Sequence, residues 1–422
     1  MNKWYRVSTA LVGTALAMTT LAACGGSSST GSTNKCSGPL VIATELAVSG
    51  TDAGAQLPAQ YGADLAIQQN PDLGSGCKLS VKHDNYEGTS GVDPSIGAGN
   101  ATALVSDPTV IGVMGTFNSG VAKVVIPIIT PAHLVMISPA NTNPGLTKQQ
   151  YAQANGINFT QLHPAGYPEA YFRVVGTDDV QGKVDAQIAA AAPINAKSAY
   201  VVDDNSTYGI GLANYFTTNF QANGGTVVGR SSITATQASS FPSLAASIAS
   251  KNPDTVMLAG VTSGGLGLLK KDLVQAGYTK PAVGGDGIAE DPAWIDAAGS
   301  GALGTYGSVA APDTSQFTSG ASAKFVSDYK AAFPGKDLTP YSATSYDAAM
   351  IIIQAIKSVI ASDKPVTREN VRAAVAGISH TGVTGQISFD ANGDNSGTKV
   401  FSIYWIDSST NGQWAFKEQV NG

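Results

Sequence analysis

The chain has 422 residues, which is more than one ordinary hydrophobic core accommodates, so two domains are expected. Hydrophobic residues make up 43% of it, as in globular proteins, but charged residues make up only 13%, about half of the usual share of roughly 25%. The net charge is -6 and Lys and Arg form no cluster, which argues against a nucleic-acid partner.

The first 24 residues have the pattern of a targeting segment. Lys3 and Arg6 precede an apolar stretch, 11–23, that is shorter than the ~20 residues of a membrane span. It ends in Leu-Ala-Ala-Cys at Cys24, and small residues before a cleavage site are typical of secreted proteins. This ending also resembles the bacterial lipobox, so we predict that Cys24 is acylated; an ordinary signal peptide is the alternative. The Gly/Ser/Thr-rich residues 25–36 predict a flexible tether.

Two further cysteines, Cys36 and Cys77, form an even pair in an oxidising compartment. Cys36 precedes the first expected strand and Cys77 opens the second. Adjacent parallel strands begin at the same edge of a sheet, so we predict a disulfide between these cysteines. Two free buried thiols are the alternative.

Short apolar runs alternate with helical patterns in the first part of the chain. This alternation predicts βαβ units and a parallel sheet. The run from Val110 to Met114 is continuously apolar, as in a strand that is covered on both faces. The expected strands are 39–47, 78–84, 109–114 and 133–137, and the expected helices are 58–70, 94–106 and 119–130.

After a polar, irregular stretch, 143–170, the pattern begins again and predicts a second α/β lobe. Two lobes of similar size indicate a bilobed protein with a cleft between them. The expected strands are 198–203, 225–233, 254–260 and 281–285, and the helices are 179–192, 208–222, 241–251 and 264–276. A strand after 304, helices at 319–332, 342–361 and 367–376, and strands at 385–389 and 400–405 complete the chain.

The sequence lacks the motifs that would indicate an enzyme or a metal site. The sequence contains no Gly-x-Ser-x-Gly elbow and no Walker-type phosphate loop. Its four histidines are scattered without metal-ligand spacing: His83, His133, His163 and His380. We therefore predict no catalytic residue, no metal and no cofactor.

Asp390, Asn392 and Asp394 are spaced as in a calcium loop. The EF-hand requires Gly at loop position 6 and Glu at position 12, but Asn395 and Phe401 stand there. A hairpin turn explains these Asp, Asn and Gly residues better.

Several segments in order resemble type I periplasmic binding proteins, and most closely the leucine/isoleucine/valine-binding branch. The resemblance covers roughly residues 38–407. The segments that carry it are Val110–Thr116, Val135–Pro144, Tyr171–Arg173, Asp178–Gly182, Val201–Gly209, Tyr346–Ala348 and Phe389–Asp394.

The resemblance implies two doubly wound, Rossmann-like lobes joined by three crossing segments, with ligand in the cleft at the carboxyl ends of the strands. The crossings are expected near 173–177, 304–310 and 380–386. The first lobe is then 37–174 plus 308–382, and the second is 175–307 plus 383–422.

The resemblance also implies a site for a zwitterion. In the family, a hydroxyl at the position of Thr116 holds the ligand carboxylate, and N–H groups at a helix start attract anions. The alternative is that Thr116 and Ser119 only cap the helix. The expected residues on the carboxylate side are Gly115, Thr116, Ala140, Asn141 and Thr142, and Phe117 beside Thr116 is expected to supply an apolar wall.

The expected ammonium partner is Asp286, where the branched-chain binders carry Glu, together with the cleft aromatic Tyr208. A second-lobe Tyr of the family should lie near Val261 and Thr262, and neither is aromatic. This departure weakens the match to branched-chain amino acids. Glu45 faces either the cleft or solvent.

We therefore expect an extracytoplasmic, lipid-anchored substrate-binding protein of an ABC importer. It closes its lobes on an amino acid, possibly a branched-chain one, and docks as a monomer on permease subunits. The alternatives are an amide, urea or aromatic acid as cargo, or a sensory module.

Overall fold

The computed structural model describes residues 35–36, 38–89, 91–234 and 240–422. The predicted targeting segment, its Cys24 and residues 25–34 of the tether lie outside the described residues. Both lobes described below belong to one compact unit, 34–422. Within the described ranges, no helix is both long enough and apolar enough to cross a membrane.

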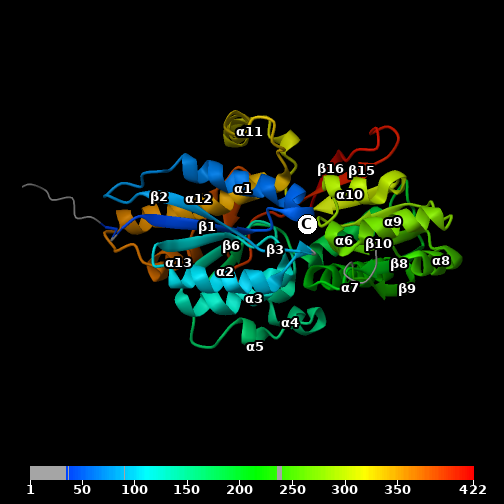
Figure 1. Cartoon of the computed structure of the whole chain (residues 1–422), viewed down its shortest axis with the longest axis horizontal. Coiled ribbons are helices and arrows are strands. Elements are labelled where there is room, and N and C mark those ends of the chain that lie inside the picture. Colours follow the sequence, from blue (N-terminus) through cyan, green and yellow to red (C-terminus); the bar gives the residue numbers. More distant parts are fainter. Residues whose placement is uncertain (1–34, 37, 90, 235–239) are drawn as a thin grey trace, which may run out of the picture. The chain divides into compact units, whose positions relative to one another are not determined.

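The first lobe contains, within the described residues, a five-stranded parallel sheet in the order β2-β1-β5-β6-β7. Helices α1 and α12 cover one face and α2 and α3 the other, so segments far apart in sequence lie side by side (Figure 1). The bounds are β1 Leu40–Leu46, β2 Leu79–Asn85, β5 Val110–Gly115, β6 Val135–Ser138, β7 Tyr171–Arg173, α1 Ala53–Gln68, α2 Pro94–Ser106, α3 Ser119–Ile129 and α12 Pro340–Ala361.

The second lobe contains, again within the described part of the chain, a seven-stranded sheet in the order β16-β15-β12-β11-β10-β8-β9. Its strands are parallel from β9 to β12, and β15 and β16 are antiparallel additions. Helices α6 and α7 pack on one face, and α8, α9 and α10 on the other. The strands are β8 Ser198–Asp203, β9 Thr226–Ser232, β10 Thr255–Ala259, β11 Ala282–Gly284, β12 Thr305–Val309, β15 Val400–Ile406 and β16 Ala415–Asn421. The helices are α6 Asp178–Ala190, α7 Thr207–Ala222, α8 Pro242–Lys251, α9 Leu266–Gln275 and α10 Pro292–Ala298.

The prediction of two doubly wound α/β lobes is confirmed. Eight short elements were not expected, three of them among the strands and helices named above. Strand β7 has only three residues, α10 has seven, and β16 is polar at many positions, so their patterns are weak. The remaining helices and strands are α4 Gln149–Ala152, α5 Phe159–Leu162, α11 Gly320–Ala332, α13 Arg368–Ala376, β3 Glu87–Gly88, β4 Gly91–Val92, β13 Ser379–Thr381 and β14 Gln386–Ser388.

The chain passes between the lobes at three places, two of them later than expected. The first crossing lies between β7 and α6, at 174–177, as predicted. Residues 305–309 form a strand inside the second sheet, so the second crossing begins after Val309 rather than at 304–310. Residues 379–388 form the β13–β14 hairpin, so the third crossing follows Ser388. The predicted lobe boundaries at 308 and 383 therefore fall inside a strand and a hairpin.

Cys36 and Cys77 form the predicted disulfide. Their strands are the adjacent parallel pair β1 and β2, in which Leu40 lies opposite Leu79. The bond therefore ties together the two strand starts at one edge of the first sheet.

Residues 389–395 form a turn, as predicted. Phe389 pairs with Asn395, and Asp390 Oδ1 accepts the N–H groups of Asn392 (2.9 Å) and Asp394 (3.0 Å). One oxygen of the Asp390 carboxylate thus stabilises the turn itself. In the described ranges, no group of three or more His, Cys, Asp or Glu residues is placed to hold a metal ion.

Candidate functional site

The turn after β5 requires glycine at its first position. Gly115 has a φ of +148°, and a Cβ atom there would lie 2.6 Å from the backbone oxygen of Glu45. A side chain at this position would therefore clash with the neighbouring strand. The tight approach lets residues 116–118 turn directly into α3, whose N-cap is Asn118.

The buried side chain of Tyr86 binds this turn through its hydroxyl group. Its hydroxyl accepts the backbone N–H of Phe117 (3.0 Å) and lies 3.0 Å from Asn118 Oδ1. Gln56 donates to the same Asn118 oxygen at 2.9 Å. The N–H of Phe117 is therefore occupied, and the first N–H groups of α3, those of Ser119 and Gly120, remain for an anion because they have no acceptor within the helix.

Thr116 and Asn141 bind each other rather than facing a cavity. Both side chains are fully buried. The Thr116 hydroxyl lies 3.3 Å from Asn141 Oδ1 and 3.2 Å from the Asn118 carbonyl oxygen, and Asn141 Nδ2 donates to the Phe117 carbonyl at 2.7 Å. Together they join the turn after β5 to the turn after β6.

A small cavity of about 20 Å³, called here the inner cavity, lies between the lobes. Its volume accommodates about one water molecule. The structure brings five of the eight expected residues to this cavity, whereas Gly115, Thr116 and Asn141 do not line it. The lining residues are Phe117, Asn118, Ser119, Ala140, Thr142, Tyr208, Val261, Asp286 and Gly287.

Asp286, just beyond β11, is the acid of the inner cavity. Its Oδ1 accepts the Tyr208 hydroxyl at 2.7 Å, and its Oδ2 accepts the Tyr341 hydroxyl from α12 of the first lobe. A Cβ atom at Gly285 would lie 2.5 Å from the Tyr208 oxygen, so glycine there lets the phenol reach the acid. Burial raises the pKa of Asp286, and hydrogen bonds from Tyr341, Tyr208 and Gln181 offset part of this rise.

A second buried carboxyl group, that of Asp178, lies close enough to Asp286 to interact with its charge. Asp178 begins α6, and its N–H donates to the Thr142 carbonyl at 2.8 Å. Burial and the charge of Asp286 raise the pKa of Asp178 well above its usual value, and the Thr142 side chain offsets this only in part. No Lys, Arg or His is among the described residues that line the inner cavity. The electrostatics therefore favour a cationic group.

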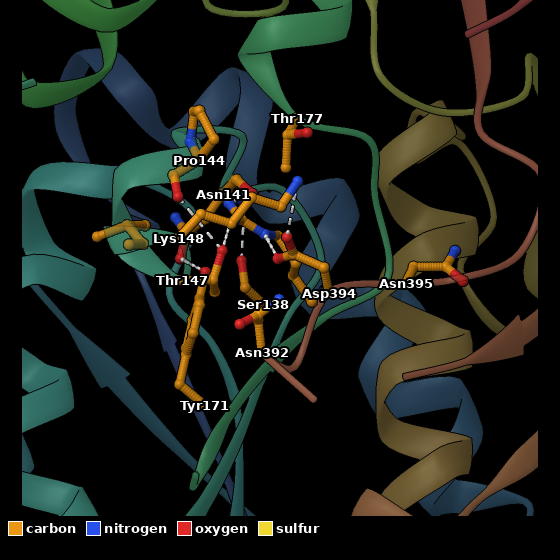
Figure 2. A network of polar contacts seen from close by, with 12 residues as sticks. Ser138, Asn141, Pro144, Thr147, Lys148, Tyr171, Thr177, Asn392, Asp394 and Asn395 are labelled. Carbon is orange, nitrogen blue, oxygen red and sulfur yellow. Dashed lines mark hydrogen bonds and ion pairs between the residues drawn. The ribbon is translucent and has the colours of Figure 1, made fainter. Parts of the chain in front are cut away.

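A buried guanidinium positions the turn that carries Ala140 and Thr142. Arg173, fully buried at the end of β7, donates from Nη1 to the carbonyl oxygens of Asn141 (3.0 Å) and Asn143 (2.8 Å), which flank Thr142. Its Nε pairs with Asp394 Oδ1 at 2.6 Å, and Lys148 lies 3.3 Å from Asp394 Oδ2. Figure 2 shows Thr147, Lys148 and Asp394 turned toward this polar network.

Glu45 faces neither the inner cavity nor solvent. It is fully buried, and Asn100 Nδ2 donates to its Oε1 at 3.1 Å. Burial raises the pKa of Glu45 to about 8. Both interpretations of this residue from the sequence are therefore wrong.

Tyr341 and Asp178 are the main residues that the sequence did not predict for the site. Asn118 lies in the turn before α3, whose N–H groups the sequence analysis expected to attract an anion. A Gly-x-Gly-x-x-Gly run at 299–304 follows α10 and precedes β12. A dinucleotide fingerprint needs the opposite order, strand then helix, so this run indicates no cofactor.

Two doubly wound lobes that share a cavity with a buried acid define a bilobed solute-binding protein of the type I periplasmic fold. Comparison with known sequences agrees with this class. The chain belongs to the periplasmic binding protein family, whose sequence pattern matches residues 40–412. Proteins of this family act outside the cytoplasm and bind solutes without transforming them, which confirms the expectation of a binding protein rather than an enzyme.

Two curated relatives illustrate the similarity. Leu/Ile/Val-binding protein BraC3 from Rhizobium johnstonii is 29% identical over 244 residues, 57% of this chain and 59% of that protein, so the match spans little more than half of the relative. Leu/Ile/Val-binding protein homolog 1 from Brucella abortus is 28% identical over 370 residues, 84% of this chain and 87% of that protein.

Solved structures show the same fold. LivJ, a branched-chain amino acid transporter substrate-binding protein from Streptococcus pneumoniae in complex with isoleucine, has a TM-score of 0.74 at 24% identity, covering 91% of this chain and 100% of LivJ. A solute-binding protein of an ABC transporter from R. palustris in complex with benzoate has a TM-score of 0.68 at 22% identity, covering 90% and 96%.

Proposed function

We propose that this protein is the substrate-binding component of an ABC importer and captures an amino acid in the cleft between its lobes. The observation that carries the proposal is the buried carboxyl of Asp286, which lines the inner cavity and is held by one tyrosine from each lobe. An α-ammonium group placed there exchanges its hydration for a charge-assisted hydrogen bond. The N–H groups at the start of α3 suit the carboxylate of the same molecule.

An aromatic acid is the second candidate cargo. The edge-to-face pair of Phe117 and Tyr341, with ring centroids 4.9 Å apart, would pack against an aromatic ring. However, benzoate-like acids carry no cation for Asp286. Their negative charge would instead lie near two buried carboxyl groups, so an amino acid is the better match.

Isothermal calorimetry with the twenty amino acids and with benzoate tests the proposal. We expect at least one amino acid to bind, and Asp286→Asn to weaken its binding by about 2 kcal/mol or more, the size of one hydrogen bond to a charged group. Ser409→Ala, in an exposed turn of the second lobe, is the matched control. Tight binding of benzoate by wild type and Asp286→Asn alike would refute the amino-acid assignment.

The proposal includes lobe closure about the three crossings. A ligand that touches both lobes stabilises the closed form by its differential affinity for that form. Small-angle scattering with and without saturating amino acid measures the change. An unchanged radius of gyration at saturation argues against closure.

The proposal also includes anchoring by a lipid on Cys24, docking of a monomer on permease subunits, and cargo from the branched-chain class or near it. The support is the lipobox-like ending at Cys24 and the curated relatives. Metabolic labelling with an alkyne fatty acid should label the wild-type chain and not Cys24→Ser. Labelling of both, or of neither, would exclude acylation at this cysteine.

A further inference from the structure

A second and much larger cavity, called here the outer chamber, adjoins the inner cavity. Its volume is about 430 Å³, and its walls come from both lobes. It shares four lining residues with the inner cavity, namely Asn118, Ser119, Tyr208 and Val261. The two spaces are therefore neighbouring parts of one cleft.

The space around Asp286 is too small for a whole amino acid. The inner cavity is about 20 Å³, and a third cavity beside Phe117, Tyr341 and Asp286 is also about 20 Å³. Each accommodates about one water molecule. The outer chamber, in contrast, falls within the roughly 300–1,000 Å³ that is typical of small-molecule sites.

The outer chamber exists although the lobes already touch. Ser263 donates to Asp52 Oδ1 at 3.0 Å, and Asn143 Nδ2 donates to the Thr207 carbonyl at 2.7 Å. Each of these hydrogen bonds joins one lobe to the other. The chamber therefore lies between lobes that are in direct contact with each other.

Val261 explains why the two spaces adjoin. It lines both of them, and it lies near the position where the resemblance led us to expect a tyrosine. A valine side chain ends at its two methyl groups, so it does not fill the boundary as an aromatic ring would. A ligand bound at Asp286 can extend past Val261 into the outer chamber.

The chamber walls suit a polar group. The starts of α3 and α7 contribute the hydroxyl groups of Ser119 and Thr207. Lys123 from the first lobe and Asp204 from the second also line it, and the Asp204 carboxylate accepts hydrogen bonds from Ser206 and from the Val261 N–H. Val261 and other apolar side chains complete the walls. Such mixed lining recognises an arm with hydrogen-bonding groups rather than a purely aliphatic one.

We infer that the cargo is an amino compound with a polar arm longer than a branched-chain side chain, its ammonium at Asp286 and its arm in the outer chamber. The inference rests on the proposed function, since it takes Asp286 as the ammonium partner. An amino acid with a long polar side chain and a short peptide share this chemistry.

Filling the chamber tests the inference. A Cβ atom at Gly120 would have its nearest neighbours at 3.9 Å (Thr207 Oγ1) and 4.0 Å (Pro94 Cγ), so Gly120→Leu projects into the chamber without a backbone clash. Gly99→Leu is the matched control, because a Cβ atom at Gly99 on α2 meets nothing within 4 Å and Gly99 does not line the chamber. Val261→Leu is a second narrowing variant. Thermal unfolding confirms that each variant is folded.

Calorimetry then compares alanine, leucine, glutamine and the dipeptide Ala-Gln as probes. We expect wild type to bind glutamine or Ala-Gln at least about tenfold tighter than leucine. Gly120→Leu should remove that advantage, and Gly99→Leu should change nothing. Tighter binding of glutamine would indicate an amino acid with a long polar side chain as cargo, and tighter binding of Ala-Gln would indicate a short peptide.

The experiment distinguishes a failure of this inference from a failure of the proposed function. If leucine or alanine binds through Asp286, but longer polar probes bind no tighter and Gly120→Leu has no effect, the outer chamber holds no arm and only this inference fails. If no amino compound binds wild type, or Asp286→Asn binds them equally well, the proposed function fails and this inference with it.

Discussion

Arg173 and Asp394 form a buried ion pair, with Nε and Oδ1 2.6 Å apart, although 221 positions separate them in the sequence. Arg173 ends β7 at the first crossing, and Asp394 lies at the third, between β14 and β15. The same guanidinium fixes the carbonyl groups on both sides of Thr142. One buried charge pair thus connects two crossings to the turn that lines the inner cavity.

Asp394→Asn should lower the free energy of unfolding by about 3 kcal/mol at pH 7, because removing one partner leaves the other charge buried without compensation. Urea unfolding measures the change. Asp328→Asn is the control, since Asp328 pairs with the exposed Lys324, and surface pairs contribute about 0–1 kcal/mol. Equal small effects of both substitutions would show that the buried pair does not stabilise the fold.

The effect of Asp394 should also depend on pH. Burial alone would raise the pKa of Asp394, but the charges of Arg173 and Lys148 lower it below its usual value. Its contribution to stability is therefore complete above the unfolded pKa of about 3.9 and is lost as the pH falls through the folded pKa. The difference between wild type and Asp394→Asn should be constant from about pH 6 to 5 and shrink below about 4. A difference that persists unchanged at pH 3 contradicts this assignment.

Glu45→Gln should stabilise the protein. Burial raises the pKa of Glu45 from 4.5 to about 8, so the unfolded chain releases this proton at lower pH than the folded chain does. Wild-type stability should therefore fall between pH 4.5 and about 8, and the variant should not show this fall. At about 1.4 kcal/mol for each pKa unit, we expect a gain of roughly 3 kcal/mol at pH 7 and almost none at pH 4.5.

Urea unfolding at several pH values tests this prediction. The exposed Glu418→Gln serves as the control for loss of a negative charge. A destabilised Glu45→Gln at pH 8 would show that the buried carboxylate is held by stronger contacts than the Asn100 hydrogen bond.

Replacing both Cys36 and Cys77 by Ser should destabilise the fold by about 4 kcal/mol on the chain-entropy account, because the bond closes a loop with a sequence separation of 41. Guanidinium unfolding of the double variant measures the cost. Wild type unfolded in the presence of a thiol reductant should behave like the variant. If the reduced wild type keeps its full stability, the disulfide contributes little beyond the packing around it.

Cargo binding should weaken on acidification earlier than an ordinary aspartate would predict. Burial raises the pKa of Asp286, and the ammonium needs the ionised form. Protonated Asp286 at low pH therefore reduces affinity, and the loss should begin well above the usual aspartate pKa of about 3.9. Calorimetry from pH 8 to 4 gives the profile, and Asp286→Asn should flatten it. A flat wild-type profile down to pH 4 would be inconsistent with an Asp286–ammonium contact.

The sequence predicted the alternating elements well because strands buried on both faces carry continuous apolar runs. Helix α2 was predicted at its observed limits, 94–106. The resemblance placed both Tyr208 and Asp286 in the cleft, and both line the inner cavity. Tyr341 was missed because α12 is apolar along most of its length, and tertiary packing alone decides which turn reaches the other lobe.

Thr116 shows where prediction from the sequence fails for a site residue. Its residue type suits a ligand hydroxyl, and the motif around it resembles the family. In the folded chain, Asn141 and the Asn118 carbonyl oxygen offer closer partners, and the side chain turns toward them. A short polar side chain in a turn has several hydrogen-bond acceptors within reach, and the sequence alone does not predict which of them it binds.

The disulfide also has a mechanical consequence. A pull applied through residues ahead of Cys36 reaches the covalent bond before it reaches the first hydrogen bond of β1. The load passes through Cys77 to β2 and is shared by two neighbouring strands. Tension on the amino-terminal end would therefore drag the whole edge of the sheet, instead of peeling away one strand, residue by residue.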